Sequence, residues 1–236
     1  MNDNLLEIKN LSKSFGKNKV LSGINITLKK GSVLGLMGEN GAGKSTMMKC
    51  LFGIYEQDEG QFFLDGKPID FKSPKEALEN GVSMVHQELN QCLDRTVMDN
   101  LFLGRYPKKF GVVDEKRMFR ESSRLFSSLK MNVNPNVIMR TMSVSQRQMV
   151  EIAKAVSYNA KIIVLDEPTS SLTEPEINKL FAIVRDLRAK GVSFVYISHK
   201  MDEIFQICDE VSVLRDGNMV KKKTTLDAKM DELISA

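Results

Sequence analysis

Short apolar runs alternate with segments of helical periodicity along most of the chain. Val33–Met37 is apolar apart from one glycine, and a glycine-rich loop and a helical segment ending near Gly53 follow it. From Glu174 to Gly191, apolar residues recur at the spacing of an amphipathic helix. Further strand-like runs are Val82–Gln87, Lys161–Glu167, Val192–Ser198 and Glu210–Gly217. Buried strands that alternate with helices predict an α/β fold with a mostly parallel sheet.

The pattern changes in the middle of the chain. Strand-like runs are absent there, and Met, Leu, Arg and Ser recur at helical spacing, with one break at Pro107 and Gly111. This segment is predicted to be a helical insertion in a single domain. The predicted division is a helical subdomain at about 94–158 and a core at about 1–93 and 159–236, which together form one domain of residues 1–236.

Composition restricts the class of protein. With 236 residues, 42% hydrophobic and 27% charged, the chain can bury a core and stay soluble. The net charge of +4 does not indicate a nucleic-acid partner, and Lys221–Lys223 is predicted to be a solvated strand end. No apolar run approaches the roughly 20 residues that span a bilayer, and no signal peptide is visible. Three scattered cysteines without a C-x-x-C pair predict a reducing compartment, and therefore a cytoplasmic protein.

The segment GENGAGKST, Gly38 to Thr46, matches the phosphate-loop pattern G-x-x-x-x-G-K-[ST] between a predicted strand and a predicted helix. Its glycines let backbone N–H groups turn inward around phosphates. Lys44 is expected to reach the β- and γ-phosphates of ATP, and the hydroxyl of Ser45 is expected to hold Mg²⁺. The residues predicted to bind ATP in this loop are Gly38, Asn40, Gly41, Ala42, Gly43, Lys44, Ser45 and Thr46.

Two acidic residues, Asp166 and Glu167, follow the apolar run Ile162–Leu165. Ligands bind at the carboxyl ends of the strands in an open parallel sheet. We therefore predict that Asp166 holds Mg²⁺ through water and that Glu167 polarises the water attacking the γ-phosphate. Adjacent carboxylates in a loop are otherwise often a solvated turn, but the preceding strand and the phosphate loop favour the catalytic interpretation.

Other polar residues end the neighbouring apolar runs. His199 follows Val192–Ser198 and is predicted to contact the γ-phosphate. Gln87 ends another run, and its amide is predicted to sense Mg²⁺ or the attacking water. His86 alternates to the opposite face and is predicted to be structural. Phe15 is predicted to stack on adenine, although the sequence alone fits a core position equally well.

These residues together resemble the nucleotide-binding domain of ATP-binding-cassette (ABC) transporters over nearly the whole chain. The resemblance implies a P-loop NTPase (RecA-like) core with a mostly parallel sheet, an antiparallel β subdomain and an inserted α-helical subdomain. It implies ATP and Mg²⁺ as cofactors. The roles that it implies are catalysis by Glu167, His199 and Gln87, metal binding by Ser45, Gln87 and Asp166, and adenine stacking by Phe15.

Several segments narrow the resemblance to the first cassette of bacterial monosaccharide importers, most similar to galactose/methylgalactoside importers. These segments are MGENGAGKSTMMKCLFGIY, MVHQELN, NLFLGRYP, VEIAKA, LDEPTSSLTEPEINKLF and VYISHKMDEIFQICDEVSVLRDG. The resemblance implies an ATPase that energises sugar import as a peripheral subunit at the cytoplasmic face of the bacterial plasma (inner) membrane. The implied partners are a second cassette, membrane-spanning permease subunits and, indirectly, a periplasmic or extracellular sugar-binding protein. No nucleic acid is implied.

Two segments depart from the family pattern. Ser143 and Gln146 occupy the signature, which binds the ATP of a second cassette in trans, but Val144 and Ser145 stand where L-S-G-G-Q has glycines. A β-branched Val144 would be strained if its position required a positive φ. In the D-loop, Thr173 replaces the aspartate of S-A-L-D. Because the family's second cassette has a degenerate phosphate loop and an intact signature, the resemblance implies one hydrolytic site and one mainly structural site.

Other functions remain possible from the sequence. A soluble ABC-type ATPase acting on nucleic acid or ribosomes usually carries a long coiled-coil or basic insertion before the signature, which this chain lacks. A non-hydrolytic regulatory ATP-binding module is disfavoured by Glu167 and His199. Nothing resembles the acceptor-substrate site of a kinase. Glu88–Phe102 is predicted to contact the membrane subunits, and its alternative interpretation is an ordinary surface loop.

Overall fold

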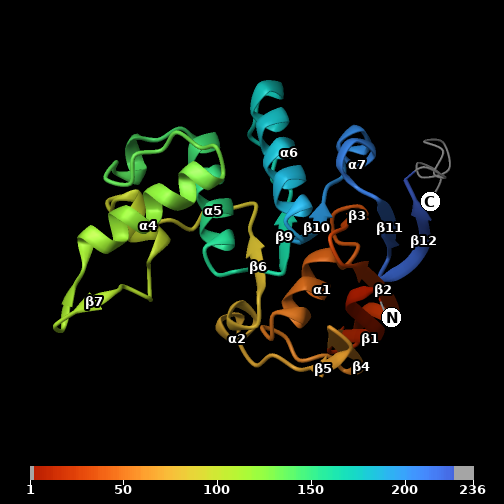
Figure 1. The fold of residues 1–236 in the computed structure, drawn as a ribbon. Coiled ribbons are helices and arrows are strands. Elements are labelled where there is room, and N and C mark those ends of the chain that lie inside the picture. The colour runs from red at the N-terminus through yellow and green to blue at the C-terminus, as the bar shows by residue number, and fades with distance from the viewer. Residues whose placement is uncertain (1–2, 226–236) are drawn as a thin grey trace.

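The computed structural model describes residues 3–225. A six-stranded sheet lies at the centre of the fold (Figure 1). In spatial order its strands are β12 (Asn218–Thr224), β11 (Glu210–Arg215), β3 (Val33–Met37), β10 (Ser193–Ile197), β9 (Ile162–Asp166) and β6 (Val82–Val85). Neighbouring strands are parallel except for β12, which pairs antiparallel with β11 at the sheet edge. The mostly parallel sheet predicted from the sequence is therefore confirmed. Residues 1–2 and 226–236, which the predicted domain range includes, lie outside the described residues.

Both faces of this sheet are covered, which explains why its central strands β3, β10 and β9 are mostly apolar. In β3, Val33 and Met37 contribute to one hydrophobic core, while Leu34 and Leu36 contribute to the other. The first core also contains side chains of α5 (Val144–Val156), α6 (Glu174–Ala189) and α7 (Met201–Ile207). The second contains those of α1 (Lys44–Leu51). The alternation of side chains along each strand thus feeds two cores at once.

An antiparallel sheet closes the second core. Its strands, in spatial order, are β2 (Asn18–Lys29), β1 (Asn4–Phe15), β4 (Glu59–Leu64) and β5 (Lys67–Ile69). This sheet is the antiparallel β subdomain that the family resemblance implies, but β1 and β2 are not among the strand-like runs recognised in the sequence. The pairing of β1 with β2 shifts register several times, and Asn10 takes a φ of 53°. Such bulges break the strict alternation by which a half-buried strand is recognised in a sequence.

Helices dominate between the two halves of the core. They are α3 (Val97–Leu101), α4 (Glu115–Ser128), the 3₁₀ turn η1 (Met139–Thr141) and α5, while α2 (Pro74–Glu79) precedes β6. The prediction that this segment lacks strands is wrong at one place. A short hairpin, β7 (Lys108–Lys109) and β8 (Val112–Val113), turns through Phe110 and Gly111, both at positive φ. Two consecutive positive φ values are what a type I′ hairpin turn requires.

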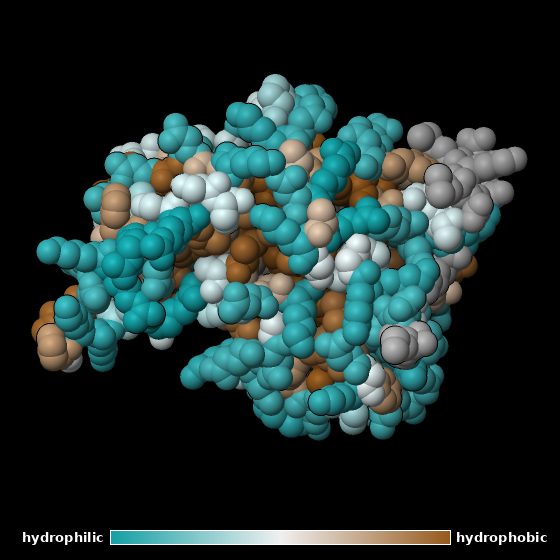
Figure 2. Space-filling view, viewed as in Figure 1, coloured by the Kyte–Doolittle hydropathy of each residue, from teal (hydrophilic) through white to brown (hydrophobic). Residues whose placement is uncertain are grey.

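The hairpin tip is exposed. Phe110 is 95% exposed and Val112 71%, and Figure 2 shows the corresponding hydrophobic surface at the left end of the molecule. Within residues 3–225, none of the helices combines the length and apolar character that crossing a bilayer requires.

The parallel register brings four chain segments to one edge. Ile197 of β10 lies beside Asp166 of β9 and Leu36 of β3, and Val85 of β6 lies beside Leu165 of β9. The residues that follow these strands therefore emerge together at their carboxyl ends, where ligands of open parallel sheets bind.

Candidate nucleotide site

The loop between β3 and α1 contains two glycines, Gly38 and Gly43, at which an added Cβ would meet neighbouring atoms too closely. Gly43, at the N-cap of α1, has a φ of 106°, and a Cβ there would lie 2.6 Å from Leu21 Cδ2. A Cβ on Gly38 would lie 2.3 Å from the carbonyl oxygen of Leu214. No side chain caps the start of α1. Its first N–H groups are therefore available to a ligand, and an anion is favoured there.

Lys44 is the buried cation of this loop, with 8% of its surface exposed. Its Nζ donates hydrogen bonds to the backbone oxygens of Gly38 at 2.6 Å and Glu39 at 2.9 Å. Burial lowers the pKa of Lys44, and the carboxylates of Glu167 and Asp166 partly offset that effect. A phosphate anion would be a stronger partner for this ammonium than neutral carbonyls.

The two acidic residues behave differently. Burial, and then the neighbouring Glu167 carboxylate, raise the pKa of Asp166 above its ordinary range, while His86 and Lys44 oppose the rise. Glu167 has a φ of 44°, which is uncommon for a residue with a Cβ. Its backbone N–H donates to the carbonyl of Ile197 at 2.9 Å. Its carboxylate Oε1 lies 3.1 Å from Nδ1 of His199.

Most of the predicted residues line one cavity of about 250 Å³. Its lining consists of Asn40, Gly41, Gly43, Lys44, Ser45, Thr46, Gln87, Asp166 and Glu167. His199 adjoins this group through Glu167. Gly38 joins it through its bond to Lys44, and Ala42 is buried inside the loop. Phosphate-binding groups and carboxylates are therefore placed together, as attack of water on a phosphate requires.

A hydrated Mg²⁺ fits the oxygen donors of this cavity. Asp166 offers a carboxylate, Ser45 a hydroxyl and Gln87 an amide oxygen, and the two latter side chains are exposed to solvent. Mg²⁺ is usually held by one or two carboxylates, substrate phosphates and several waters. Among residues 3–225 there is no group of three or more His, Cys, Asp and Glu that could hold a metal ion.

Phe15 and His86 are not among the residues that line this cavity. Phe15 ends β1, is 45% exposed and packs edge-to-face on Tyr55 with ring centroids 5.1 Å apart. It does not line the cavity, so its stacking on adenine stays a prediction. His86 is exposed and acts electrostatically on Asp166.

The signature residues begin α5 and lie away from this cavity. Ser143 is the N-cap: its Oγ accepts from the N–H of Gln146 at 3.2 Å, and Gln146 Oε1 accepts from the N–H of Ser143 at 3.0 Å. Val144 is the first residue of the helix and needs no positive φ. The strain considered in the sequence therefore does not arise. Ser143, Ser145 and Gln146 instead line a separate hollow between α5 and α6.

Val144→Gly is accordingly expected to lower the stability of the ligand-free chain slightly, by about 0.5 kcal/mol or less, because glycine weakens a helix more than valine does. Urea unfolding of the Val144→Gly chain beside Val144→Ala measures this. A gain of 1 kcal/mol or more on introducing glycine would mean that Val144 is strained after all.

The hydrophobic pattern did not single out two residues close to the site, Thr169 and Glu203. Glu203 lies four residues before the buried Ile207, so helical spacing places it on the buried face of α7. A carboxylate at a buried helical position is the feature of the sequence that could have identified Glu203. Its hydroxyl partner Thr169 comes from another segment and could not be deduced locally.

Comparison with known proteins places the fold in one class. The model of the family described as "ABC transporter" matches residues 21–170. A solved nucleotide-free ATP-binding cassette of an ABC transporter superposes with a TM-score of 0.86 at 27% identity, covering 99% of this chain and 96% of that one. The ADP conformation of MJ1267, another such cassette, gives 0.85 at 28% identity, covering 98% of each chain. The fold is thus the P-loop NTPase fold that the sequence predicted, and the chain belongs to the ABC transporter family.

More similar relatives are named galactose/methyl galactoside import ATP-binding protein MglA. The protein of this name from Treponema denticola is 74% identical over 236 residues, all of this chain and 48% of that protein. Those from Treponema pallidum and Clostridium perfringens are 72% and 58% identical, over 98% of this chain and 47% and 45% of theirs. The predicted resemblance is confirmed. The chain spans about half the length of the curated relatives it matches.

Proposed function

We propose that this chain binds ATP with Mg²⁺ at the edge cavity, hydrolyses it, and thereby energises import of a monosaccharide of the galactose or methyl galactoside kind. The observation that carries the proposal is the convergence of the phosphate loop, Asp166 and Glu167 on one cavity, with His199 in contact with Glu167. The named relatives, at 58–74% identity, support the sugar class.

In this proposal the chain's own groups carry each step. The loop N–H groups and Lys44 hold the β- and γ-phosphates, and the ordered loop excludes other orientations. Mg²⁺, when bound with ATP at Asp166, Ser45 and Gln87, supplies charge neutralisation of the phosphates. Glu167 orients the attacking water and draws its proton towards Oε1 or Oε2. His199, next to Glu167, contacts the γ-phosphate and holds that carboxylate in place.

We further propose that Ser143 and Gln146 act in trans on the ATP of a second cassette. The exposed N-terminus of α5 offers N–H groups and the positive end of a helix dipole to a phosphate. Both residues lie apart from this chain's own cavity, which supports a role towards a neighbour. Because relatives are about twice as long, the second cassette is proposed to be fused in the same protein.

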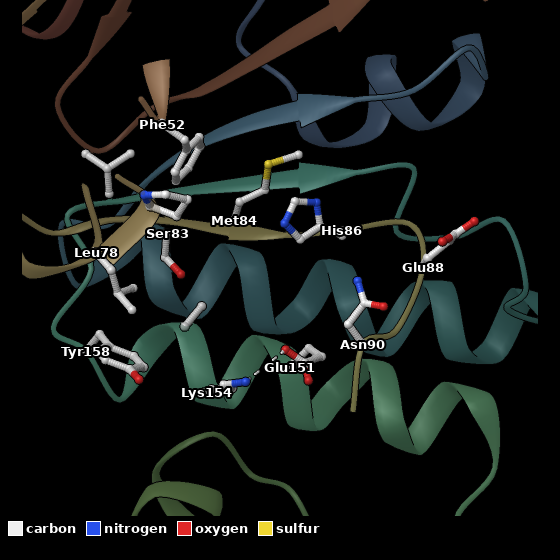
Figure 3. Close-up of a pocket in the computed structure, with 13 residues that line it drawn as sticks. Phe52, Leu78, Ser83, Met84, His86, Glu88, Asn90, Glu151, Lys154 and Tyr158 are labelled. Atoms are coloured by element: carbon white, nitrogen blue, oxygen red, sulfur yellow. Dashed lines mark ion pairs between the residues drawn. The ribbon is translucent and has the colours of Figure 1, made fainter. Parts of the chain in front are cut away.

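We propose that membrane-spanning permease subunits dock in a groove beside Gln87 (Figure 3). Its volume is about 230 Å³, and it lies between β6 and α5. Phe52 and Leu78 supply apolar surface, while His86 and Glu88 line the end next to Gln87. A segment docked there would contact the backbone on either side of Gln87, the residue predicted to sense Mg²⁺ or the attacking water.

We propose the remaining organisation on the same basis. Residues 1–236 form one ATP-binding domain, with the helical subdomain at about 94–158 inserted into a core of about 1–93 and 159–236. The domain acts peripherally at the cytoplasmic face of the plasma membrane. A sugar-binding protein outside the membrane is its indirect partner.

Thermal unfolding with nucleotides tests the proposed function. ATP with Mg²⁺ is expected to raise the midpoint, since ligand at 100 times its Kd stabilises by about 2.7 kcal/mol. AMP is the matched control: it keeps the adenosine but lacks the β- and γ-phosphates that the loop holds. No shift with MgATP, or an equal shift with AMP, contradicts the proposal. Release of phosphate by the chain then establishes hydrolysis.

A further inference from the structure

Glu203 is a buried carboxylate that the proposed mechanism does not use. It lies in α7 with 5% of its surface exposed. Thr169 Oγ1 donates to its Oε1 at 2.6 Å, and Tyr196 OH donates to its Oε2 at 2.7 Å. Ser198 Oγ also donates to Oε2 at 3.2 Å, and Lys200 Nζ lies 3.0 Å from Oε1. These partners occupy the roughly four acceptor positions of an ionised carboxylate.

The partners of Glu203 come from the two segments that carry Glu167 and His199. Thr169 is two residues beyond Glu167 and is 2% exposed. Ser198 directly precedes His199 and is 3% exposed, and its Oγ also accepts from the backbone N–H of Lys200 at 3.0 Å. Glu203 is therefore hydrogen-bonded to the same two segments that carry Glu167 and His199, whose side chains lie 3.1 Å apart.

The backbone of Glu167 requires such support. A non-glycine residue at a φ of 44° holds strain that persists only where the surroundings fix it. The bond from the Glu167 N–H to the Ile197 carbonyl fixes one side of the turn. On the other side, the turn continues through Pro168 to Thr169, whose side chain is fixed by Glu203.

From this geometry we infer that Glu203 is a positioning residue for the reaction: through Thr169 and Ser198 it sets the relative placement of the Glu167 carboxylate and the His199 imidazole. The inference rests on the proposed function for its catalytic consequence. Its geometric content concerns this chain alone and can be tested without nucleotide.

Two hydroxyl deletions separate positioning from simple stabilisation. Thr169→Val and Tyr196→Phe each remove one hydroxyl donor from the same buried carboxylate. Of these two residues, Thr169 belongs to the turn that carries Glu167, whereas Tyr196 lies inside β10. A merely structural Glu203 predicts similar losses for both variants. A positioning Glu203 predicts that Thr169→Val changes the reaction and Tyr196→Phe does not, although both lower the unfolding midpoint.

The chain contains two histidines, His86 and His199, so the imidazole Cε1–Hε1 region of a ¹H–¹³C spectrum holds two signals. Glu167→Gln defines where the His199 signal moves when its partner carboxylate is lost, and His86 serves as the internal reference. Thr169→Val and Glu203→Gln are expected to move the His199 signal towards that position at fixed pH. Tyr196→Phe is expected to leave it in place.

Single-turnover hydrolysis of ATP by excess chain supplies the catalytic readout. Glu203→Gln and Thr169→Val are each expected to lower the rate at saturating ATP about 10-fold or more, because small misplacement of reacting groups is costly. The half-saturating ATP concentration should stay within about two-fold, since the phosphate loop is untouched. The double variant should be little slower than either single one, as expected for residues acting through one contact.

An unchanged His199 signal and rate in both Thr169→Val and Glu203→Gln overturns the inference. An equal loss of rate in Tyr196→Phe also overturns it, in favour of a structural role. If MgATP does not raise the unfolding midpoint of the unsubstituted chain, the proposed function fails, and the His199 signal then decides the positioning role independently. Should Glu203→Gln not fold, Thr169→Val and Tyr196→Phe still decide between the two outcomes.

Discussion

Glu167→Gln is expected to lower ATP hydrolysis by about 10²- to 10⁴-fold, the contribution typical of a general base, while ATP binding is retained. Glutamine keeps the size and the hydrogen-bonding oxygen of the side chain but cannot accept the proton of the attacking water. It also removes the negative charge that raises the pKa of Asp166. Loss of that repulsion leaves Asp166 better suited to hold a cation, so MgATP binding should not weaken.

Single-turnover phosphate release and the MgATP-dependent unfolding midpoint measure the two halves of this prediction. Glu115→Gln, an exposed carboxylate at the start of α4, is the matched control and should change neither. Retention of substantial hydrolysis by Glu167→Gln would exclude Glu167 as the base. The same substitution in a two-cassette relative tests whether one site carries the turnover: substantial remaining turnover there contradicts a single hydrolytic site.

The sequence identified those parts of the site that depend on local pattern. Four predicted strands end beside one another because parallel strands in register must end at one edge, and this fact alone gathers Asp166, Glu167, Gln87 and the phosphate loop. The phosphate-loop pattern itself is local in the sequence, although the atoms that leave no room for a Cβ at Gly38 and Gly43 belong mainly to Leu214 and Leu21 in other strands. Fold class and most candidate residues therefore followed from pattern and resemblance.

What the sequence did not predict depends on contacts between distant segments. The left-handed backbone of Glu167 is held by Ile197, thirty positions later, and by Thr169 and Glu203. The strain considered for Val144 was absent because the residue begins a helix capped by Ser143 and Gln146. Propensity at one position cannot reveal which of these outcomes tertiary packing selects.

Lys44→Met is expected to abolish most nucleotide binding without lowering the stability of the ligand-free chain. Loss of charge-assisted hydrogen bonds to phosphate, worth about 1.5–3 kcal/mol each, should weaken MgATP binding by about 10- to 100-fold or more. The stability of the ligand-free chain, by contrast, should rise or stay unchanged. The buried ammonium has a folded-state pKa below its unfolded value, so folding is penalised at neutral pH. Methionine fills a similar volume without that penalty.

The sign of the pH dependence follows from the same shift. As pH rises through the lowered pKa of Lys44 towards its unfolded value of 10.5, the folded chain loses the proton first and its penalty disappears. The stability gained by Lys44→Met should therefore be largest near neutral pH and shrink in alkaline solution. Lys75→Met, whose side chain is 83% exposed, is the control and should show neither effect.

Thermal unfolding of Lys44→Met with and without MgATP decides between two roles for this cation. If the fold needed the ammonium to hold the carbonyls of Gly38 and Glu39, the ligand-free midpoint would fall and the MgATP shift would shrink only in proportion. If the ammonium is kept for phosphate, the ligand-free midpoint holds or rises while the MgATP shift disappears. Retention of the full MgATP shift would contradict a phosphate-binding role for Lys44. A buried charge that penalises the empty fold and is needed only with ligand is expected at a functional site, because stability there is given up for binding.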